Sequence, residues 1–292
     1  MASTAPNPSP RRPIIGVSTK MYFSLARTSA FIDSTIALLT SSSSSSPASG
    51  AAALSSWSSS SSTPLSHIDA FIIPDFVAIP GAVRAVSAAP APANRLLVGA
   101  QDCAARDFGP LTGEVSPAVL REAGCGIVEV GHAERRRLFA ETDADVRAKA
   151  AAVLRNGMVP LVCVGEGSPD GGPEAAATEV VRQVGLALEG LDGTAPGAQV
   201  VLAYEPVWAI GAAEPAGVDY VREVVRRVRE SEVLQGDGWK GRVRIVYGGA
   251  AGPGLWAKLS GDVDGLFIGR FGHQPEQFVG MLYEVAGMER QS

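Results

Sequence analysis

The sequence predicts a closed (β/α)8 barrel that forms one domain. The chain has 292 residues, 46% of them hydrophobic, so it can bury a single large core. Short apolar runs typical of buried parallel strands alternate with segments of helix-like composition. Eight such runs occur, the number of strands that this barrel requires.

The expected elements follow one another along the whole chain. The strands are expected at residues 14–17, 70–73, 96–100, 127–130, 159–164, 200–204, 243–247 and 265–268. The clearest helix-like segments are 144–155, 174–188 and 218–233. An open doubly wound sheet is the alternative. Its dinucleotide fingerprint is missing, because the glycine-rich segment 248–254 (GGAAGPG) lacks G-x-G-x-x-G spacing and comes late in the chain.

Two segments fall outside this alternation. Residues 1–13 are rich in proline and are expected to form a disordered tail, and the barrel domain is placed at 14–288. Residues 40–64 are rich in serine and almost uncharged, which predicts a disordered, low-complexity insertion after the first helix. Trp57 in this insertion is expected to be an incidental exposed residue; a docking anchor is the alternative.

Composition argues against several classes of protein. A net charge of −5 and a pI near 5.3 provide no basic field for nucleic acid. The three cysteines lack CxxC spacing and the chain has three histidines, so we expect no disulfide framework and no metal site. No apolar run approaches the roughly 18 to 20 residues of a membrane helix, and prolines occupy the place of a signal peptide's apolar region. The expected location is cytoplasmic.

Four polar residues lie just past the ends of expected strands, where a barrel presents its active site: Lys20, His132, Glu134 and Glu205. Removing a proton from carbon next to a carbonyl requires a carboxylate base, a hydrogen-bond donor to the enolate oxygen and a nearby cation. Glu205, His132 and Lys20 match these three roles. Each alone has a simpler explanation, a packed histidine or a solvated acid, but their distribution over three strands favours a site.

Several segments carry a resemblance to the triosephosphate isomerase family over nearly the whole chain. They are GHAERRRLFAETD (131–143), PLVCVGE (160–166), AYEPVWAIG (203–211), VYGGA (246–250) and DVDGLFIG (262–269). The resemblance implies an aldose–ketose isomerase that interconverts dihydroxyacetone phosphate and glyceraldehyde 3-phosphate through an enediolate, with no cofactor. The alternatives are a non-catalytic relative, which would usually have lost its base, and an unrelated barrel enzyme such as an aldolase.

The resemblance also implies roles for individual residues. Glu205 would be the base, His132 the neutral electrophile and Lys20 the active-site cation, with Glu134 a second acid close to Lys20. The neutral state of this histidine is a known case of pKa tuning in the family. Residues 206–216 would form a lid that excludes water from the enediolate.

Further residues are implied to support the site or to bind substrate. Cys163 and Glu166 would be supporting residues. Main-chain amides at the glycine-rich ends of the last two strands would hold the phosphate. The residues implied in substrate binding are Ser18, Gly211, Gly249, Ala250, Gly269 and Arg270.

The chain also departs from the family pattern. Ser18 stands where the family has asparagine, Arg270 replaces a glycine, and the lid reads GAAEPA at 211–216. With Glu129, two residues before Gly-His, these departures resemble a branch that isomerises erythrulose phosphate, a four-carbon ketose phosphate. Strand alternation predicts that Glu129 faces away from His132 and pairs with an arginine. Arg270 is expected either to enter the pocket or to pair with an acid.

The expected partners are a small phosphorylated sugar and a second copy of the chain. Residues 101–117 resemble the family's interdigitating dimer loop, which implies a homodimer in which this loop supports the partner's Ser18 and Lys20. We expect no interaction with nucleic acid or membranes.

Overall fold

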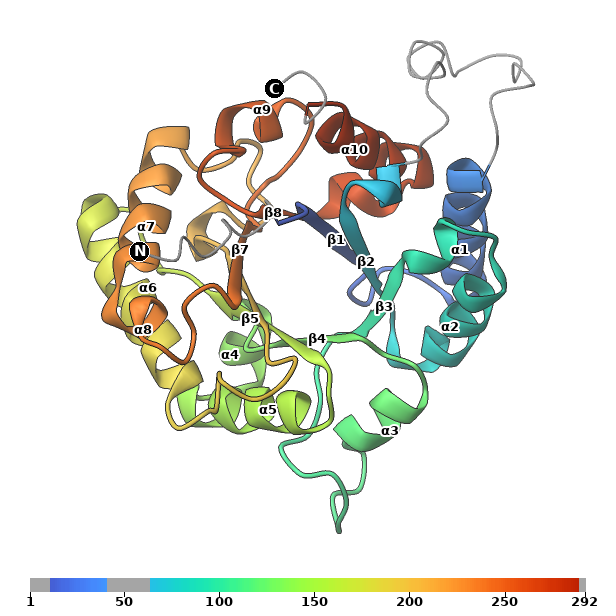
Figure 1. The fold of residues 1–292 in the computed structure, drawn as a ribbon, viewed down its shortest axis with the longest axis horizontal. Helices are drawn as coiled ribbons and strands as arrows, with labels where there is room; N and C mark the ends of the chain where they lie inside the picture. Colours follow the sequence, from blue (N-terminus) through green and yellow to red (C-terminus); the bar gives the residue numbers. More distant parts are fainter. Residues whose placement is uncertain (1–10, 41–63, 289–292) are drawn as a thin grey trace, which may run out of the picture.

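The computed structural model, which describes residues 11–40 and 64–288, contains a closed barrel of parallel strands surrounded by helices (Figure 1). The strands are β1 (Ile14–Ser18), β2 (Asp69–Ile73), β3 (Leu97–Ala100), β4 (Ile127–Val130), β5 (Val159–Val164), β6 (Val200–Tyr204), β7 (Val243–Tyr247) and β8 (Gly265–Ile268). Each strand pairs with the next, and β8 pairs with β1, so the sheet has no free edge. The predicted fold is confirmed.

Closure depends on one glycine. Gly265 of β8 lies opposite Ile14 of β1 in the parallel ladder. A Cβ atom at Gly265 would come within 1.7 Å of the Ile14 carbonyl oxygen, so no larger residue fits there. The two strands can therefore approach closely enough to complete the ring.

The helices form the outer layer. They are α1 (Leu25–Thr40), α2 (Ile79–Ala88), α3 (Pro117–Glu122), α4 (Ala133–Phe139), α5 (Asp143–Arg155), α6 (Gly172–Leu188), α7 (Val218–Glu230), α8 (Glu232–Gln235), α9 (Leu255–Leu259) and α10 (Pro275–Met288). One apolar cluster joins these helices to the outer faces of the strands. A second consists almost wholly of strand residues, among them Phe71, Leu161 and Phe267, and fills the inside of the barrel.

The expected helix over 218–233 is interrupted. Helix α7 ends at Glu230 because Ser231 has an extended backbone (ψ 147°), and α8 begins immediately afterwards. The sequence predicted one helix because helix-like composition continues through the break.

The expected tail and insertion lie mostly outside the described residues. This applies to residues 1–10 and 41–63, including Trp57. Arg11 is described, and its guanidinium donates a hydrogen bond of 3.0 Å to the Val243 carbonyl. Within the described ranges, no helix is both long and apolar enough to cross a membrane.

Candidate active site

The predicted base lies at the carboxyl end of β6. Glu205 is 6% exposed, and its Oε2 lies 3.5 Å from Nε2 of His132. The Cys163 thiol lies against this carboxyl group. Burial raises the pKa of Glu205 to about 7, against the opposing charge of Lys20. A carboxyl group with such a pKa can accept and return a proton near neutral pH.

His132 follows β4 and begins α4. Its Nδ1 accepts a 3.1 Å hydrogen bond from the main-chain amide of Glu134. In the neutral ring, the proton is therefore on Nε2, the atom that faces Glu205. Burial and the charge of Lys20 lower the pKa of His132 to about 4. The ring is a neutral hydrogen-bond donor at physiological pH.

Lys20 and Glu134 form an ion pair at the same end of the barrel. Lys20 Nζ lies 2.7 Å from Glu134 Oε1. Burial lowers the pKa of Lys20, but the hydrogen bond and charge of Glu134 outweigh it and the net shift is upward. Lys20 has a positive φ of 47°, a strained conformation for a non-glycine residue. Its carbonyl accepts a 2.8 Å hydrogen bond from Gln101, which helps to hold this turn.

Glu166 lies behind the site and holds the start of the expected lid. Its Oε1 accepts hydrogen bonds from Trp208 Nε1 (2.8 Å) and from the Tyr220 hydroxyl (3.0 Å). The Tyr204 hydroxyl donates to the other oxygen at 3.2 Å. Glu166 thus contacts the lid rather than the base.

The far end of the lid is anchored to β7. The main-chain amide of Ala216 donates a 2.9 Å hydrogen bond to the Tyr247 hydroxyl. Between the two anchors, Gly211 has a positive φ of 73° and its carbonyl accepts a 3.3 Å hydrogen bond from Arg270. Arg270 therefore reaches toward the lid, and no acidic partner for it is present in the described parts of the chain.

Glycines after β7 make room for the base and the lid anchor. A Cβ atom at Gly248 would lie 2.5 Å from Cγ of Glu205, and one at Gly249 would lie 2.0 Å from the Tyr247 hydroxyl. The family resemblance implied that Gly249 binds phosphate, but the packing role of Gly248 was not predicted. The Gly-Gly pair after a strand was the available signal.

The prediction for Glu129 was wrong. Its carboxyl group points into the barrel, where it accepts hydrogen bonds from Ser18 and, at 3.8 Å, from the Cys163 thiol. Alternation of side chains holds only within a strand, and β4 ends at Val130. Gly131 has a positive φ of 71°, which turns the chain and brings His132 to the same side as Glu129.

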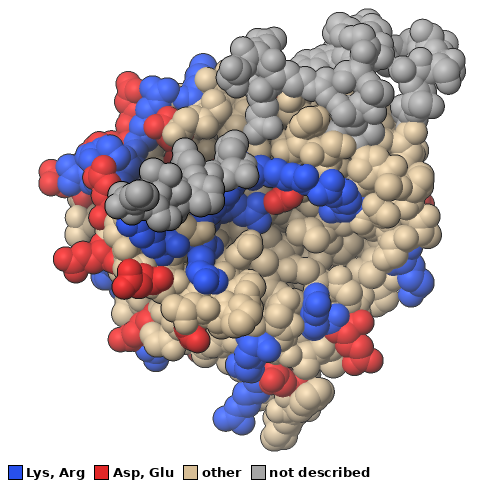
Figure 2. Space-filling view, in the orientation of Figure 1, with Lys and Arg blue, Asp and Glu red and all other residues tan. Residues whose placement is uncertain are grey.

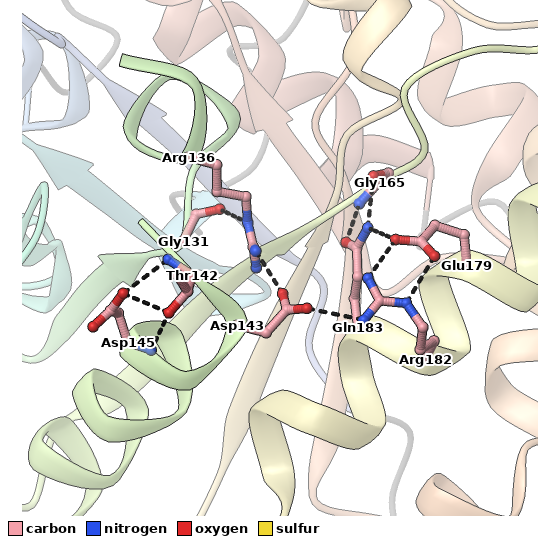
Figure 3. Close-up of polar contacts among 9 residues, drawn as sticks. All are labelled: Gly131, Arg136, Thr142, Asp143, Asp145, Gly165, Glu179, Arg182 and Gln183. Carbon is pink, nitrogen blue, oxygen red and sulfur yellow. Dashed lines mark hydrogen bonds and ion pairs between the residues drawn. The ribbon is translucent and has the colours of Figure 1, made fainter. Parts of the chain in front are cut away.

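A polar network ties together the ends of β4 and β5 (Figure 3). Arg136 donates a hydrogen bond of 2.8 Å to the Gly131 carbonyl and one of 2.6 Å to Asp143. Asp143 also accepts a hydrogen bond from Arg182. On the other side, the Gln183 amide exchanges two hydrogen bonds of 3.0 Å with the main chain of Gly165. Glu179 completes the network by accepting from both Arg182 and Gln183. The network fixes the two strand ends that precede His132 and Glu166.

The structure brings together the residues predicted at separate strand ends. Lys20, His132, Glu134 and Glu205 form one contact cluster, with Cys163 against the base. Ser18 lies beside this cluster, where its hydroxyl accepts a 3.4 Å hydrogen bond from the Lys20 amide. In the chain as described, no group of three or more His, Cys, Asp or Glu side chains is arranged to hold a metal ion.

Comparison with known proteins identifies similar sequences. The family model of triosephosphate isomerase matches residues 13–285. An L-erythrulose-1-phosphate isomerase of Pectobacterium atrosepticum is 37% identical over 284 residues, which cover 97% of this chain and 100% of that protein. One from Rhizobium etli is 40% identical over 77% of this chain and 83% of that protein. A triosephosphate isomerase of Syntrophotalea carbinolica is 41% identical over 62% of this chain and 73% of that protein.

Proposed function

Because the chain belongs to the triosephosphate isomerase family and is an isomerase of phosphorylated sugars, we propose that its substrate is L-erythrulose 1-phosphate. The observation that carries this proposal is the similarity to the Pectobacterium atrosepticum enzyme, which extends over that protein's whole length. Interconversion of dihydroxyacetone phosphate and glyceraldehyde 3-phosphate is the second candidate, supported by similarity to triosephosphate isomerases.

The chemistry of this substrate defines the reaction. L-Erythrulose 1-phosphate has its carbonyl at C2, and the oxygen on C1 is esterified to phosphate. The carbonyl can therefore move only to C3, which carries a free hydroxyl. A base removes the proton from C3, an enediolate forms across C2 and C3, and the proton returns to C2. The product is the ketose phosphate with its carbonyl at C3.

The geometry supports a role for each member of the cluster. Glu205 would move the proton, since it is buried and has a pKa near neutrality. His132 would donate from Nε2 to the oxygens on C2 and C3, which become charged in turn. Lys20, held by Glu134, would stabilise the negative charge of the bound substrate.

The phosphate would bind at the carboxyl ends of the last strands. Main-chain amides around Gly211, Gly249, Ala250 and Gly269 would hold it. Arg270, which contacts the lid at Gly211, would add positive charge at the edge of this region. Closure of residues 206–216 would exclude water and so prevent loss of phosphate from the enediolate.

We also propose that the enzyme is a homodimer located in the cytoplasm. Large apolar side chains are exposed in the loops after the first strands, including Met21 (89% exposed) and Phe108 (76%). The loop that carries Phe108 extends beyond the ring of helices (Figure 1), and its end is uncharged (Figure 2). An exposed apolar projection of this kind is typical of an interface between subunits.

Assays of the purified protein with L-erythrulose 1-phosphate and dihydroxyacetone phosphate test the proposal. We expect turnover of the four-carbon substrate with the higher kcat/KM. The Glu205→Gln variant should lose about 100- to 10,000-fold in kcat, the range that general base catalysis contributes. Glu122→Gln, an exposed change on α3, is the matched control. A preference for the triose would support the second candidate, and an active Glu205→Gln variant would contradict the mechanism.

A further inference from the structure

Glu129 is a buried acid that the proposed reaction does not use. It is 3% exposed and belongs to β4, with its carboxyl group inside the barrel. The inner cluster beside it is composed mainly of apolar side chains such as Ile127, Leu161 and Val201. Burying a carboxyl group in such surroundings costs free energy that an apolar residue would not. A function would explain its presence.

The contacts of Glu129 place it next to the reacting groups. The Cys163 thiol donates a 3.8 Å hydrogen bond to Glu129 Oε1 and also lies against the Glu205 carboxyl group. A single thiol therefore separates Glu129 from the proposed base. Lys20 forms its ion pair with Glu134 and not with Glu129. Glu129 is thus close to the site without being the partner of its cation.

Glu129 is also equipped to bind a hydroxyl group. Burial and the charge of Glu205 raise the pKa of Glu129 to about 8. At neutral pH it is mainly a carboxylic acid, which has one hydrogen-bond donor and an acceptor oxygen. The Ser18 hydroxyl, which hydrogen-bonds to Glu129, provides a second such group on a short side chain.

The proposed substrate has a terminal hydroxyl group beyond C3. In L-erythrulose 1-phosphate, C4 and its hydroxyl are attached to C3, the carbon from which the base removes a proton. With one hydrogen bond added, this hydroxyl reaches roughly 5 Å from C3. It lies on the side of C3 opposite the phosphate, and therefore away from Gly249 and Gly269.

We propose that Glu129, with Ser18, binds the C4 hydroxyl of the four-carbon substrate and so selects it over a three-carbon substrate. This inference rests on the proposed function. A three-carbon substrate lacks the terminal hydroxymethyl group and would leave the buried acid without this partner. Sites that hydrogen-bond a substrate hydroxyl discriminate strongly against analogues that lack it.

The test compares L-erythrulose 1-phosphate with its 4-deoxy analogue, which differs only in this hydroxyl. For the unmodified enzyme we expect kcat/KM to be about 100-fold higher with the hydroxylated substrate. Glu129→Leu should abolish most of this preference, because leucine can make no hydrogen bond to the C4 hydroxyl. Glu129→Gln keeps the shape and a hydrogen-bonding group, so its ratio of kcat/KM values for the two substrates should be about tenfold lower than in the unmodified enzyme.

Ile127→Val is the matched control. Ile127 faces the barrel interior two residues earlier on β4, and its shortening should leave the preference unchanged. Circular dichroism establishes whether each variant folds. If Glu129→Leu does not fold, the substrate preference of the isosteric Glu129→Gln variant tests the proposal. An unchanged preference in a folded Glu129 variant would overturn this inference alone. Equal losses on all substrates would also overturn it, since Glu129 would then act through Glu205.

Assays of the unmodified enzyme show whether a negative result contradicts the proposed function or only the role of Glu129. Absence of turnover of L-erythrulose 1-phosphate would overturn the proposed function and, with it, the role of Glu129. Turnover by the unmodified enzyme together with no effect of Glu129 substitutions would leave the proposed function intact.

Discussion

At the scale of single residues, the site depends on a balance between burial and charge at Glu205. Burial strengthens a carboxylate base by removing competing water, but it also favours the protonated form, which cannot accept a proton. Lys20 opposes this effect through its positive charge. The result is a pKa of about 7 instead of 4.5. As the proposed base, Glu205 would therefore be strong and still ionised in a useful fraction of molecules at neutral pH.

This balance predicts the pH dependence of the reaction. Only ionised Glu205 accepts a proton, so kcat/KM should fall as the pH decreases through about 7. His132 should not titrate in the same range, because its pKa is lowered to about 4. The measurement is a pH–rate profile together with a carbon-13 NMR titration of enzyme labelled at the glutamate carboxyl groups.

The NMR titration is needed because the phosphate of the substrate itself titrates near pH 6. Loss of one signal in the Glu205→Gln variant assigns the base. A Glu205 signal that titrates near 4.5, the ordinary value, would contradict the prediction.

Site residues could be predicted from the sequence where the pattern of apolar runs places them directly at the end of a strand. Lys20, His132 and Glu205 were selected in this way, and the structure brings them together. Glu129 was misplaced, because the alternation rule was extended past the end of β4 and across Gly131. A positive φ at that glycine depends on its packing, and no pattern of hydrophobicity reports it.

At the scale of elements, the loop after β7 helps to position the proposed base, because its first residue, Gly248, has no side chain. Gly248 leaves the space that Glu205 occupies, so the position of the base on β6 is determined partly by the neighbouring strand. Strand bounds were predicted to within a residue, because apolar runs mark them directly. Contacts between loops of different strands depend on barrel closure and could not be predicted from local sequence.

Substituting Gly248 should therefore impair catalysis more than stability. In Gly248→Ala, the new methyl group would approach Cγ of Glu205 to 2.5 Å and displace the base. We expect kcat/KM to fall about 100-fold, the usual effect of misplacing a catalytic group by about 1 Å.

The control is Gly252→Ala in the same loop, where an added Cβ atom meets nothing within 4 Å. Thermal unfolding of both variants distinguishes displacement of the base from a general loss of structure. Full activity in Gly248→Ala would show that the base does not require this space.

At the scale of the whole molecule, the residues that form the core and those that form the candidate site occupy different parts of the barrel. The helices and the outer faces of the strands form one continuous core, and the candidate site lies at the strand ends above it. In the proposed site, main-chain amides and Lys20 would provide the local positive potential that lets an acidic chain bind an anionic substrate. Fold class was predictable from alternation of strands and helices. The proposed subunit assembly would depend on side chains exposed by separate loops, and their grouping is visible only in the folded chain.

The projecting loop links the proposed interface to the site. Gln101, at the start of this loop, donates a 2.8 Å hydrogen bond to the carbonyl of Lys20, the residue with the strained backbone. Phe108 at its end is 76% exposed. Burial of Phe108 in a partner would order the loop and so stabilise the conformation of Lys20. Assembly and activity should therefore be lost together.

The variant Phe108→Asp tests this link, because it places a charge where an apolar side chain should be buried. Light scattering should give twice the chain mass of 30.1 kDa for the unmodified protein and a single chain mass for the variant. We expect kcat to fall about 100-fold in the monomer as Lys20 loses its fixed position. Ala257→Asp on α9, an exposed site on the other side of the barrel, controls for the added charge (Figure 1). A monomeric unmodified enzyme would contradict the proposed dimer, and a fully active monomeric variant would contradict the coupling between interface and site.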